Sequence, residues 1–215
     1  MVEPHPHPIR TLLIGDQETA PYHPLEAVQD RILALLGGAF AVTASAGRHL
    51  LREDSLSAYE LCISYTDSWD QAPAPEETAG LLRFVAGGGG LLVIHNGISL
   101  QASPELCQLI GARFIGHPPF ASLPFSVAAP EHPIAKGLEP FTMEEEPYRF
   151  ELDPLSELDI LLTYEHEGED WPAAWTRTYG LGRVAYLMPG HHAPSFDHQA
   201  YQVWIVQAAG WAAGR

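Results

Sequence analysis

The sequence predicts an α/β fold in which helices cover both faces of a mainly parallel β-sheet. In the first half, short apolar runs alternate with segments of helical periodicity, as expected for βαβ units. One of these runs, residues 91–94, is apolar at consecutive positions, which is typical of a strand covered on both faces. The second half instead predicts successive strands separated by turns, so we expect antiparallel strands there.

The first half yields four expected strands and two expected helices. A strand at 10–14 ends at Gly15-Asp16, and a helix at 25–36 stops before the Gly37-Gly38 pair. Further strands are expected at 40–45, 61–65 and 91–94, and a second helix runs from Pro75 to a glycine stop at Gly87. Parallel sheets bind ligands beyond the carboxyl ends of their strands, so Asp16, Asp67 and His95 should lie at one edge.

The second half predicts five strands and a terminal helix. We expect the last two strands to form a hairpin around the Gly180-Leu181 turn, and the terminal helix to pack back on the sheet. The strands are expected at 120–127, 148–152, 159–164, 173–178 and 183–187, and the helix at 200–212.

Length and composition predict one domain. The chain has 215 residues, of which 46% are hydrophobic and 18% charged, enough to form a sizeable core. We expect an extended or disordered leader at residues 1–9, rich in proline, and a single domain at residues 10–215. The cysteines, Cys62 and Cys107, are far apart in sequence, which argues against a disulfide framework or a thiolate zinc site.

The charge balance is strongly acidic, with 11 Lys and Arg against 27 Asp and Glu and a net charge of −16. A nucleic-acid or anionic membrane partner requires a basic face, so neither is expected. The leader lacks the basic and apolar regions of a secretion signal, and no apolar run is long enough to span a bilayer. These features predict a cytoplasmic protein.

Histidines are the main candidates for chemistry. His95 and His191 each follow an apolar strand, and His117 lies between Gly116 and Pro118. An imidazole at these positions can bind a divalent metal, act as acid or base, or hydrogen-bond sugar hydroxyls, and the spacing does not choose among these roles. The alternative is that they are capping or unrelated loop histidines.

Two other residue types could complete such a site. Glu146 ends an acidic cluster whose first member, Glu144, is expected to be solvated, and the Pro147 step could turn Glu146 toward the crevice. Trp175 could form an aromatic wall for a sugar, although a core position is the alternative. His132 is interpreted as a turn residue.

Several enzyme classes are disfavoured. The glycines at 87–90 precede a strand and no Lys-Ser or Lys-Thr pair follows, which argues against a phosphate-binding P-loop. No Gly-x-Ser-x-Gly motif is present, and neither cysteine occupies a strand-to-turn elbow, so the usual nucleophiles of amide and ester chemistry are missing.

An ordered set of motifs resembles the ThuA-like (trehalose utilisation) family over nearly the whole chain after the leader. The matching segments are residues 89–95, 109–117, 132–134, 145–148, 172–175, 179–184 and 189–191. The resemblance implies the class I glutamine amidotransferase-like fold, a flavodoxin-like three-layer sandwich. In amidotransferases of this fold a nucleophilic cysteine occupies the elbow where this chain has His95, so the resemblance argues against glutamine hydrolysis.

The family is linked to catabolism of disaccharides and oxidised sugars, which implies a hydrolase or lyase acting on a small-molecule carbohydrate. Its motif positions here are His95, His117, Glu146 and His191, with His23 as an addition from the loop after the first strand. This chain has Pro147 where many relatives carry an aliphatic residue.

We therefore expect three groups of site residues. The catalytic residues are His95, His191 and Glu146, the substrate-binding residues are His117, Asp67, Asn96 and Trp175, and the ligands of a divalent metal such as zinc, if one is bound, are His23, His95, His117 and His191. The main alternative is a sugar-binding or regulatory protein without catalytic activity. A third alternative, a glutamine amidotransferase, would need a reactive thiol, and neither Cys62 nor Cys107 is placed to provide one. The sequence is also compatible with a homo-oligomer.

Overall fold

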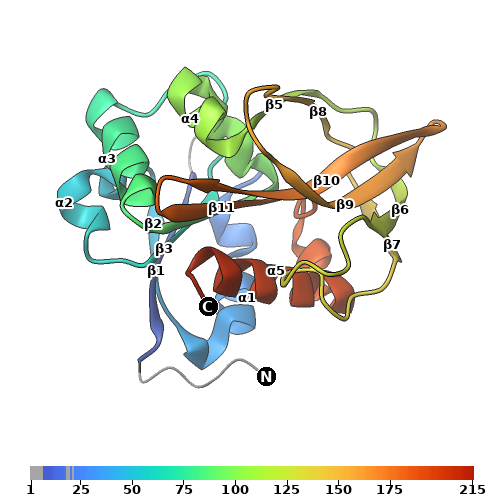
Figure 1. Cartoon of the computed structure of the whole chain (residues 1–215), viewed down its shortest axis with the longest axis horizontal. Coiled ribbons are helices and arrows are strands. Elements are labelled where there is room, and N and C mark those ends of the chain that lie inside the picture. Colours follow the sequence, from blue (N-terminus) through green and yellow to red (C-terminus); the bar gives the residue numbers. More distant parts are fainter. Residues whose placement is uncertain (1–6, 18–19, 21) are drawn as a thin grey trace.

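The computed structural model describes residues 7–17, 20 and 22–215, so residues 1–6 of the expected leader lie outside the described residues. The described part has three layers, with a nine-stranded sheet in the middle and helices on each of its faces. One face carries α1 (Gln29–Leu36) and α5 (Gln199–Ala212), and the other carries α2 (Glu53–Leu56), α3 (Pro75–Ala86) and α4 (Pro104–Ile110) (Figure 1). The predicted α/β sandwich is confirmed.

The parallel part of the sheet has the order β2-β1-β3-β4-β11. Its strands are β1 (Ile9–Gly15), β2 (Phe40–Ala46), β3 (Leu61–Tyr65), β4 (Gly90–Ile94) and β11 (Gly182–Leu187). Every residue of β3 and β4 is buried, which explains why β4 is apolar at consecutive positions and why β3 is apolar except at Ser64. The carboxyl ends of β1, β3, β4 and β11 meet at one edge.

Antiparallel strands extend the sheet beyond β11, as predicted for the C-terminal half. They follow the order β10-β9-β6-β7 and are β10 (Glu169–Tyr179), β9 (Asp159–His166), β6 (Ala121–Val127) and β7 (Phe141–Glu145). A separate antiparallel pair, β5 (Ala112–Gly116) and β8 (Arg149–Leu152), lies beside the sheet.

The segment after His95 holds elements that the sequence patterns did not predict. A 3₁₀ helix, His95–Ala102, leads into α4, whose N-terminus is capped by the Ser103 hydroxyl accepting from the Leu106 N–H at 3.4 Å. Gly111, with φ of 85°, ends α4 and directs the chain into β5. The expected helix at 25–36 also begins as a 3₁₀ turn, Leu25–Ala27, and becomes α-helical only from Gln29.

Trp175 lies in the core and not at a ligand surface. Its side chain is fully buried, its indole N–H donates to the Ile110 carbonyl at 2.9 Å, and its ring stacks on Tyr186 with centroids 4.2 Å apart. These contacts leave no face of the indole for the sugar that the sequence suggested it might bind.

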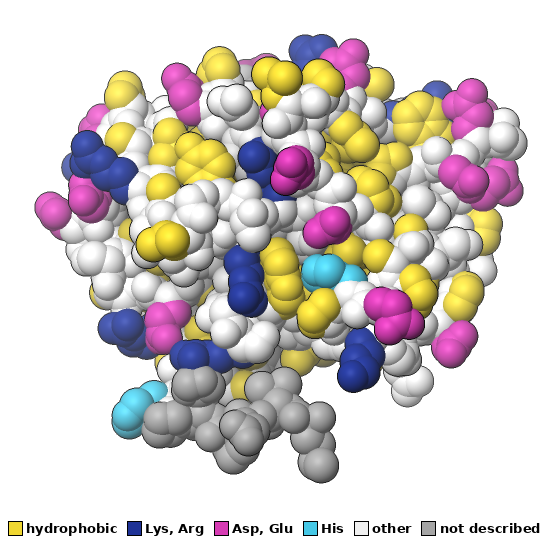
Figure 2. Space-filling view, viewed as in Figure 1, with side chains coloured by type: hydrophobic (Ala, Val, Ile, Leu, Met, Phe, Trp, Pro, Cys, Tyr) yellow, Lys and Arg dark blue, Asp and Glu magenta, His cyan; other side chains and the backbone are white. Residues whose placement is uncertain are grey.

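The face shown in Figure 2 carries side chains of both charges. On the face shown in Figure 2, Lys and Arg side chains are scattered among acidic ones and do not gather into one patch. None of the helices in the described part of the chain has both the length and the apolar composition needed to cross a bilayer.

Candidate functional site

A cavity of about 640 Å³ opens at the edge where the parallel strands end. Its walls come from the loop after β1, the loop after β3, the end of β5 and the segment between β7 and β8. The lining residues are Tyr22, His23, Trp69, Phe114, Gly116, His117, Glu146 and Tyr148. This cavity, our candidate site, therefore lies at the sheet edge that the sequence predicted.

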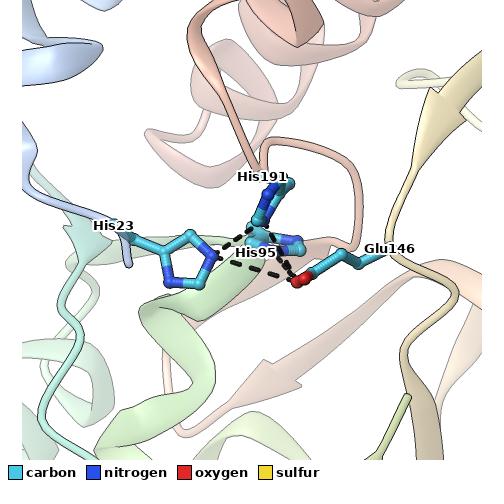
Figure 3. Close-up of side chains that lie close together, drawn as sticks. All are labelled: His23, His95, Glu146 and His191. Atoms are coloured by element: carbon cyan, nitrogen blue, oxygen red, sulfur yellow. Dashed lines mark hydrogen bonds and ion pairs between the residues drawn. The ribbon is translucent and has the colours of Figure 1, made fainter. Parts of the chain in front are cut away.

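Four side chains converge beside this cavity, namely His23, His95, Glu146 and His191 (Figure 3). His23 and Glu146 line the cavity, whereas His95 is fully buried behind them and His191 is not among the lining residues. One nitrogen from each histidine and one oxygen from Glu146 all lie within 4.8 Å of one another. Glu146 Oε2 is 3.1 Å from His191 Nδ1, 3.4 Å from His95 Nε2 and 3.9 Å from His23 Nε2. His23 Nε2 is 3.0 Å from His191 Nδ1. Residues far apart in sequence thus form one polar cluster.

The backbone at His95 is unusual. His95 directly follows β4 and has φ of +45°, a left-handed conformation that side-chain-bearing residues rarely adopt and that costs on the order of 1–3 kcal/mol. The neighbouring strand supports this turn, because the Tyr186 hydroxyl donates to the His95 carbonyl at 3.3 Å. Strain of this kind persists where surrounding structure enforces it, and here it directs the imidazole into the cluster.

Hydrogen bonds behind two of the histidines fix which ring nitrogen faces the cluster. His95 Nδ1 lies 2.6 Å from the Met188 carbonyl oxygen, and His23 Nδ1 lies 3.1 Å from Asp67 Oδ1. Both partners are acceptors, so each Nδ1 carries a hydrogen and each Nε2 presents its lone pair to the cluster in the neutral ring. This arrangement is the one that metal-binding histidines commonly have.

Asp67 is itself held in place. Its carboxylate also accepts from the His23 backbone N–H at 3.1 Å and from the Trp69 indole N–H at 2.7 Å. Burial raises the pKa of Asp67, but the hydrogen bonds from His23 outweigh burial and keep that pKa below its ordinary value. Asp67 therefore stays a carboxylate and orients His23.

The electrostatics favour a cation. Burial lowers the pKa of His95 to about 4, so its ring is neutral near pH 7. Burial would raise the pKa of Glu146, but His191 and His95 outweigh it and hold the pKa well below its usual range. The cluster thus combines a neutral imidazole with a carboxylate anion, which are the forms that bind metals.

Two buried atoms in the cluster lack hydrogen bonds. In the described part of the chain, His95 Nε2 and Glu146 Oε2 have no hydrogen-bond partner, although a buried polar atom normally has one. Their 3.4 Å separation is an ion-pair contact that is not aligned as a hydrogen bond. A cation bound between them would satisfy both.

The spacing and chemistry of the ligands also fit a metal. The four short separations, 3.0 to 3.9 Å, bracket the roughly 3.3 Å between neighbouring ligands of a tetrahedral zinc with bonds of about 2.0–2.1 Å. Three imidazole nitrogens with one carboxylate oxygen suit zinc and other transition metals better than magnesium or calcium, which prefer oxygen. The cluster could therefore hold a metal.

The remaining predicted residues take different places. His117 lies in the cavity wall with its Nε2 3.8 Å from Glu146 Oε1 and is 36% exposed, outside the four-residue cluster. Asn96 is fully buried and donates to the carbonyls of Tyr65 and Thr66 at 3.0 and 2.9 Å. Asn96 and Asp67 are not among the lining residues of the cavity, so the structure places both of these expected substrate contacts behind its wall.

Aromatic residues that the sequence analysis did not select line the cavity. Tyr148 stacks on His95 with centroids 4.1 Å apart, and Phe114 packs against both Tyr148 and Trp69 at 4.3 and 4.9 Å. Burial raises the pKa of Tyr148 well above its ordinary value, so its hydroxyl remains protonated. The sequence signal for Trp69 was its position just after a strand that ends at the site.

Glu145 was also missed. It is fully buried, and burial raises its pKa to about 7 even though hydrogen bonds from Ser195, Gly190 and His191 lower it. In β7 the residues Phe141, Met143 and Glu145 face inward in alternation with exposed Thr142 and Glu144. This two-residue period could have distinguished Glu145 from its exposed neighbour.

Comparison with known proteins shows the family. The family model described as ThuA, trehalose utilisation, matches residues 13–212. A ThuA-like protein from Parabacteroides merdae superposes with a TM-score of 0.80 at 22% identity, covering 96% of this chain and 90% of that one. A ThuA-like protein from Bacteroides uniformis gives a TM-score of 0.80 at 18% identity, with 97% and 93% covered.

A Salmonella typhimurium LT2 protein described as cytoplasmic gives a TM-score of 0.71 at 15% identity, covering 95% of this chain and 99% of that one. At these sequence identities, the similarity to these solved structures shows the fold alone. No curated protein matches the sequence. The family model, however, spans almost the whole sequence. The chain belongs to the ThuA (trehalose utilisation) family.

Proposed function

We propose that this protein is a cytoplasmic, metal-dependent hydrolase or lyase that acts on a small-molecule carbohydrate. His23, His95, His191 and Glu146 would hold a divalent metal such as zinc. The observation that carries the proposal is the convergence of their four ligand atoms, two of them buried without hydrogen bonds. When bound, such a metal supplies a Lewis acid that polarises an oxygen or activates water.

The two oxygens of Glu146 face different partners, which allows two roles. Oε2 faces the three histidines, and Oε1 lies 3.8 Å from His117 Nε2 at the cavity wall. His117 is exposed enough to exchange protons with solvent, so His117 and Glu146 Oε1 can move a proton to or from a bound substrate. The other three histidines, His23, His95 and His191, would hold the metal.

The lining of the cavity supports a carbohydrate. Trp69, Phe114 and Tyr148 offer aromatic faces, against which the C–H face of a sugar ring can pack, while His117 and Glu146 offer hydrogen bonds to hydroxyls. Among the described residues that line the cavity there is no Lys or Arg, so nothing there favours a phosphorylated sugar. Membership of a trehalose utilisation family agrees with this choice.

A second candidate function is sugar binding without catalysis. It is favoured by one observation, namely that the described residues of the cavity wall include no Ser, Thr or Cys to act as a nucleophile. In that case the cluster would orient a ligand and leave it unchanged.

The test incubates the zinc-loaded protein with a panel of mono- and disaccharides and their oxidised forms, and measures products by chromatography and Tm by calorimetry. We expect one sugar class to be consumed by the wild type and by His49→Ala, an exposed control, but not by His95→Ala or His191→Ala. A sugar that raises Tm without being consumed would establish the binding role. Neither product nor shift with any sugar would contradict both.

A further inference from the structure

We propose that Glu145 is a positioning residue that holds two ligands of the cluster, His191 and Glu146, at their working separation. The proposal rests on the proposed metal site and concerns a side chain that does not itself enter the cavity. Glu145 is fully buried at the end of β7, directly before Glu146.

The sheet does not connect these two ligands directly. Glu146 follows β7, whereas His191 lies in the loop after β11, and in the strand order β10, β9 and β6 separate β7 from β11. No ladder hydrogen bond therefore joins the two segments. A small shift of the outer strands would change the 3.1 Å separation between His191 Nδ1 and Glu146 Oε2 unless another contact fixed it.

The carboxylate of Glu145 supplies that contact. Its Oε2 accepts from the backbone N–H groups of His191 and Glu146, each at 3.3 Å. Its Oε1 accepts from the Gly190 N–H at 2.9 Å and from the Ser195 hydroxyl. One oxygen therefore bonds the backbones of both ligands, and the other anchors the loop on either side of His191.

These bonds also define what Glu145 cannot do. A carboxylate has about four lone-pair positions, and four donors already occupy those of Glu145. It is therefore saturated and is not a fifth ligand. His192 extends the anchor, because its Nδ1 lies 2.9 Å from the Ser195 hydroxyl oxygen. The side chain acts on the cluster only through the backbone of its neighbours.

The asymmetry of the contacts makes Glu145→Gln a sharp test. The amide has nearly the same shape, but it has one oxygen and one N–H₂ group. If its oxygen keeps the bonds to Gly190 and Ser195, the N–H₂ group faces the N–H groups of His191 and Glu146 and repels them. Removing a partner that orients metal ligands typically weakens metal affinity about 10- to 100-fold.

The experiment measures zinc Kd for the whole chain by competition with a chelator, together with the circular dichroism and Tm of the zinc-free protein. Glu144→Gln is the matched control, since it makes the same carboxyl-to-amide substitution at the exposed adjacent position. We expect zinc binding about 10- to 100-fold weaker in folded Glu145→Gln and unchanged in Glu144→Gln. A structural role alone would lower the Tm of Glu145→Gln and leave its zinc Kd at the wild-type value, which would overturn the proposal.

A second variant covers the case in which Glu145→Gln does not fold. Ser195→Ala removes only the hydroxyl anchor of the same carboxylate, and we expect it to weaken zinc binding by less than Glu145→Gln but measurably. Zinc affinity equal to that of the wild type would then refute the role. If the wild type itself bound no zinc, the proposed metal function would fail first, so the two failures are distinguishable.

Discussion

Asp67→Asn tests how the chain prepares His23 as a ligand. In the wild type the Asp67 carboxylate accepts three hydrogen bonds, from the His23 backbone N–H, His23 Nδ1 and the Trp69 indole. Asparagine can keep its oxygen toward His23 Nδ1 and Trp69, but its N–H₂ group then faces the His23 N–H. One buried donor loses its acceptor, and the remaining bonds lose their charge assistance.

The expected magnitudes follow from those contacts. An unsatisfied buried N–H costs about 1–3 kcal/mol, so the free energy of unfolding of the zinc-free protein should fall by about that amount. Loss of the carboxylate behind a metal-binding histidine should weaken zinc binding about 10- to 100-fold, or about 1.4–2.7 kcal/mol. The His23 ring then also loses the partner that keeps its hydrogen on Nδ1.

The assay is a chelator-competition titration of zinc, with chemical denaturation of the zinc-free protein measured alongside. Asp70→Asn is the control, because Asp70 is exposed three residues further along the same loop. Equal zinc affinity in Asp67→Asn and Asp70→Asn would refute the reasoning, since it would show that the orientation of His23 does not govern metal binding.

Three further predictions concern the core, the cavity and the metal. Trp175→Ala should lower the free energy of unfolding by about 3–5 kcal/mol, because it empties a fully buried site, while zinc Kd stays unchanged; weakened zinc binding at constant fold would contradict a purely core role. Phe114→Leu should weaken binding of the sugar found in the substrate screen by about 0.5–1.5 kcal/mol, measured by calorimetric titration, and undiminished affinity would remove Phe114 from the sugar-binding wall. Free zinc at 100 times its Kd should stabilise the protein by about 2.7 kcal/mol, seen as a rise in Tm that a chelator reverses and that His191→Ala lacks; an equal rise in that variant would place the bound zinc elsewhere.

Much of the fold could be predicted because the central parallel strands β3 and β4 are fully buried. A strand such as β4 is apolar at consecutive positions, and the polar residue that follows it, His95, therefore marks the sheet edge. The same reasoning selected His191 after β11, and the structure brings these two histidines together with His23 and Glu146. What the patterns predicted well were features that depend on local burial.

The missed features depend on long-range pairing. Whether a tryptophan packs in the core or lines a cavity cannot be judged from its neighbours in sequence, as the contrast between Trp175 and Trp69 shows. Phe114 and Tyr148 belong to the cavity because β5 pairs with β8 outside the main sheet. The paired residues Phe114 and Phe150 are 36 positions apart in the sequence. Glu145 was overlooked because its charge obscured the alternation of β7.

The central claim, that the four-residue cluster binds a metal, is tested most directly by elemental analysis of the purified, tag-free protein after incubation with zinc and removal of the excess. The account predicts a stoichiometric divalent metal in the wild type and its loss in the His95→Ala, His191→Ala double variant, with the His49→Ala control still loaded. A wild-type protein that retains no metal, or a double variant that retains as much as the wild type, would contradict it.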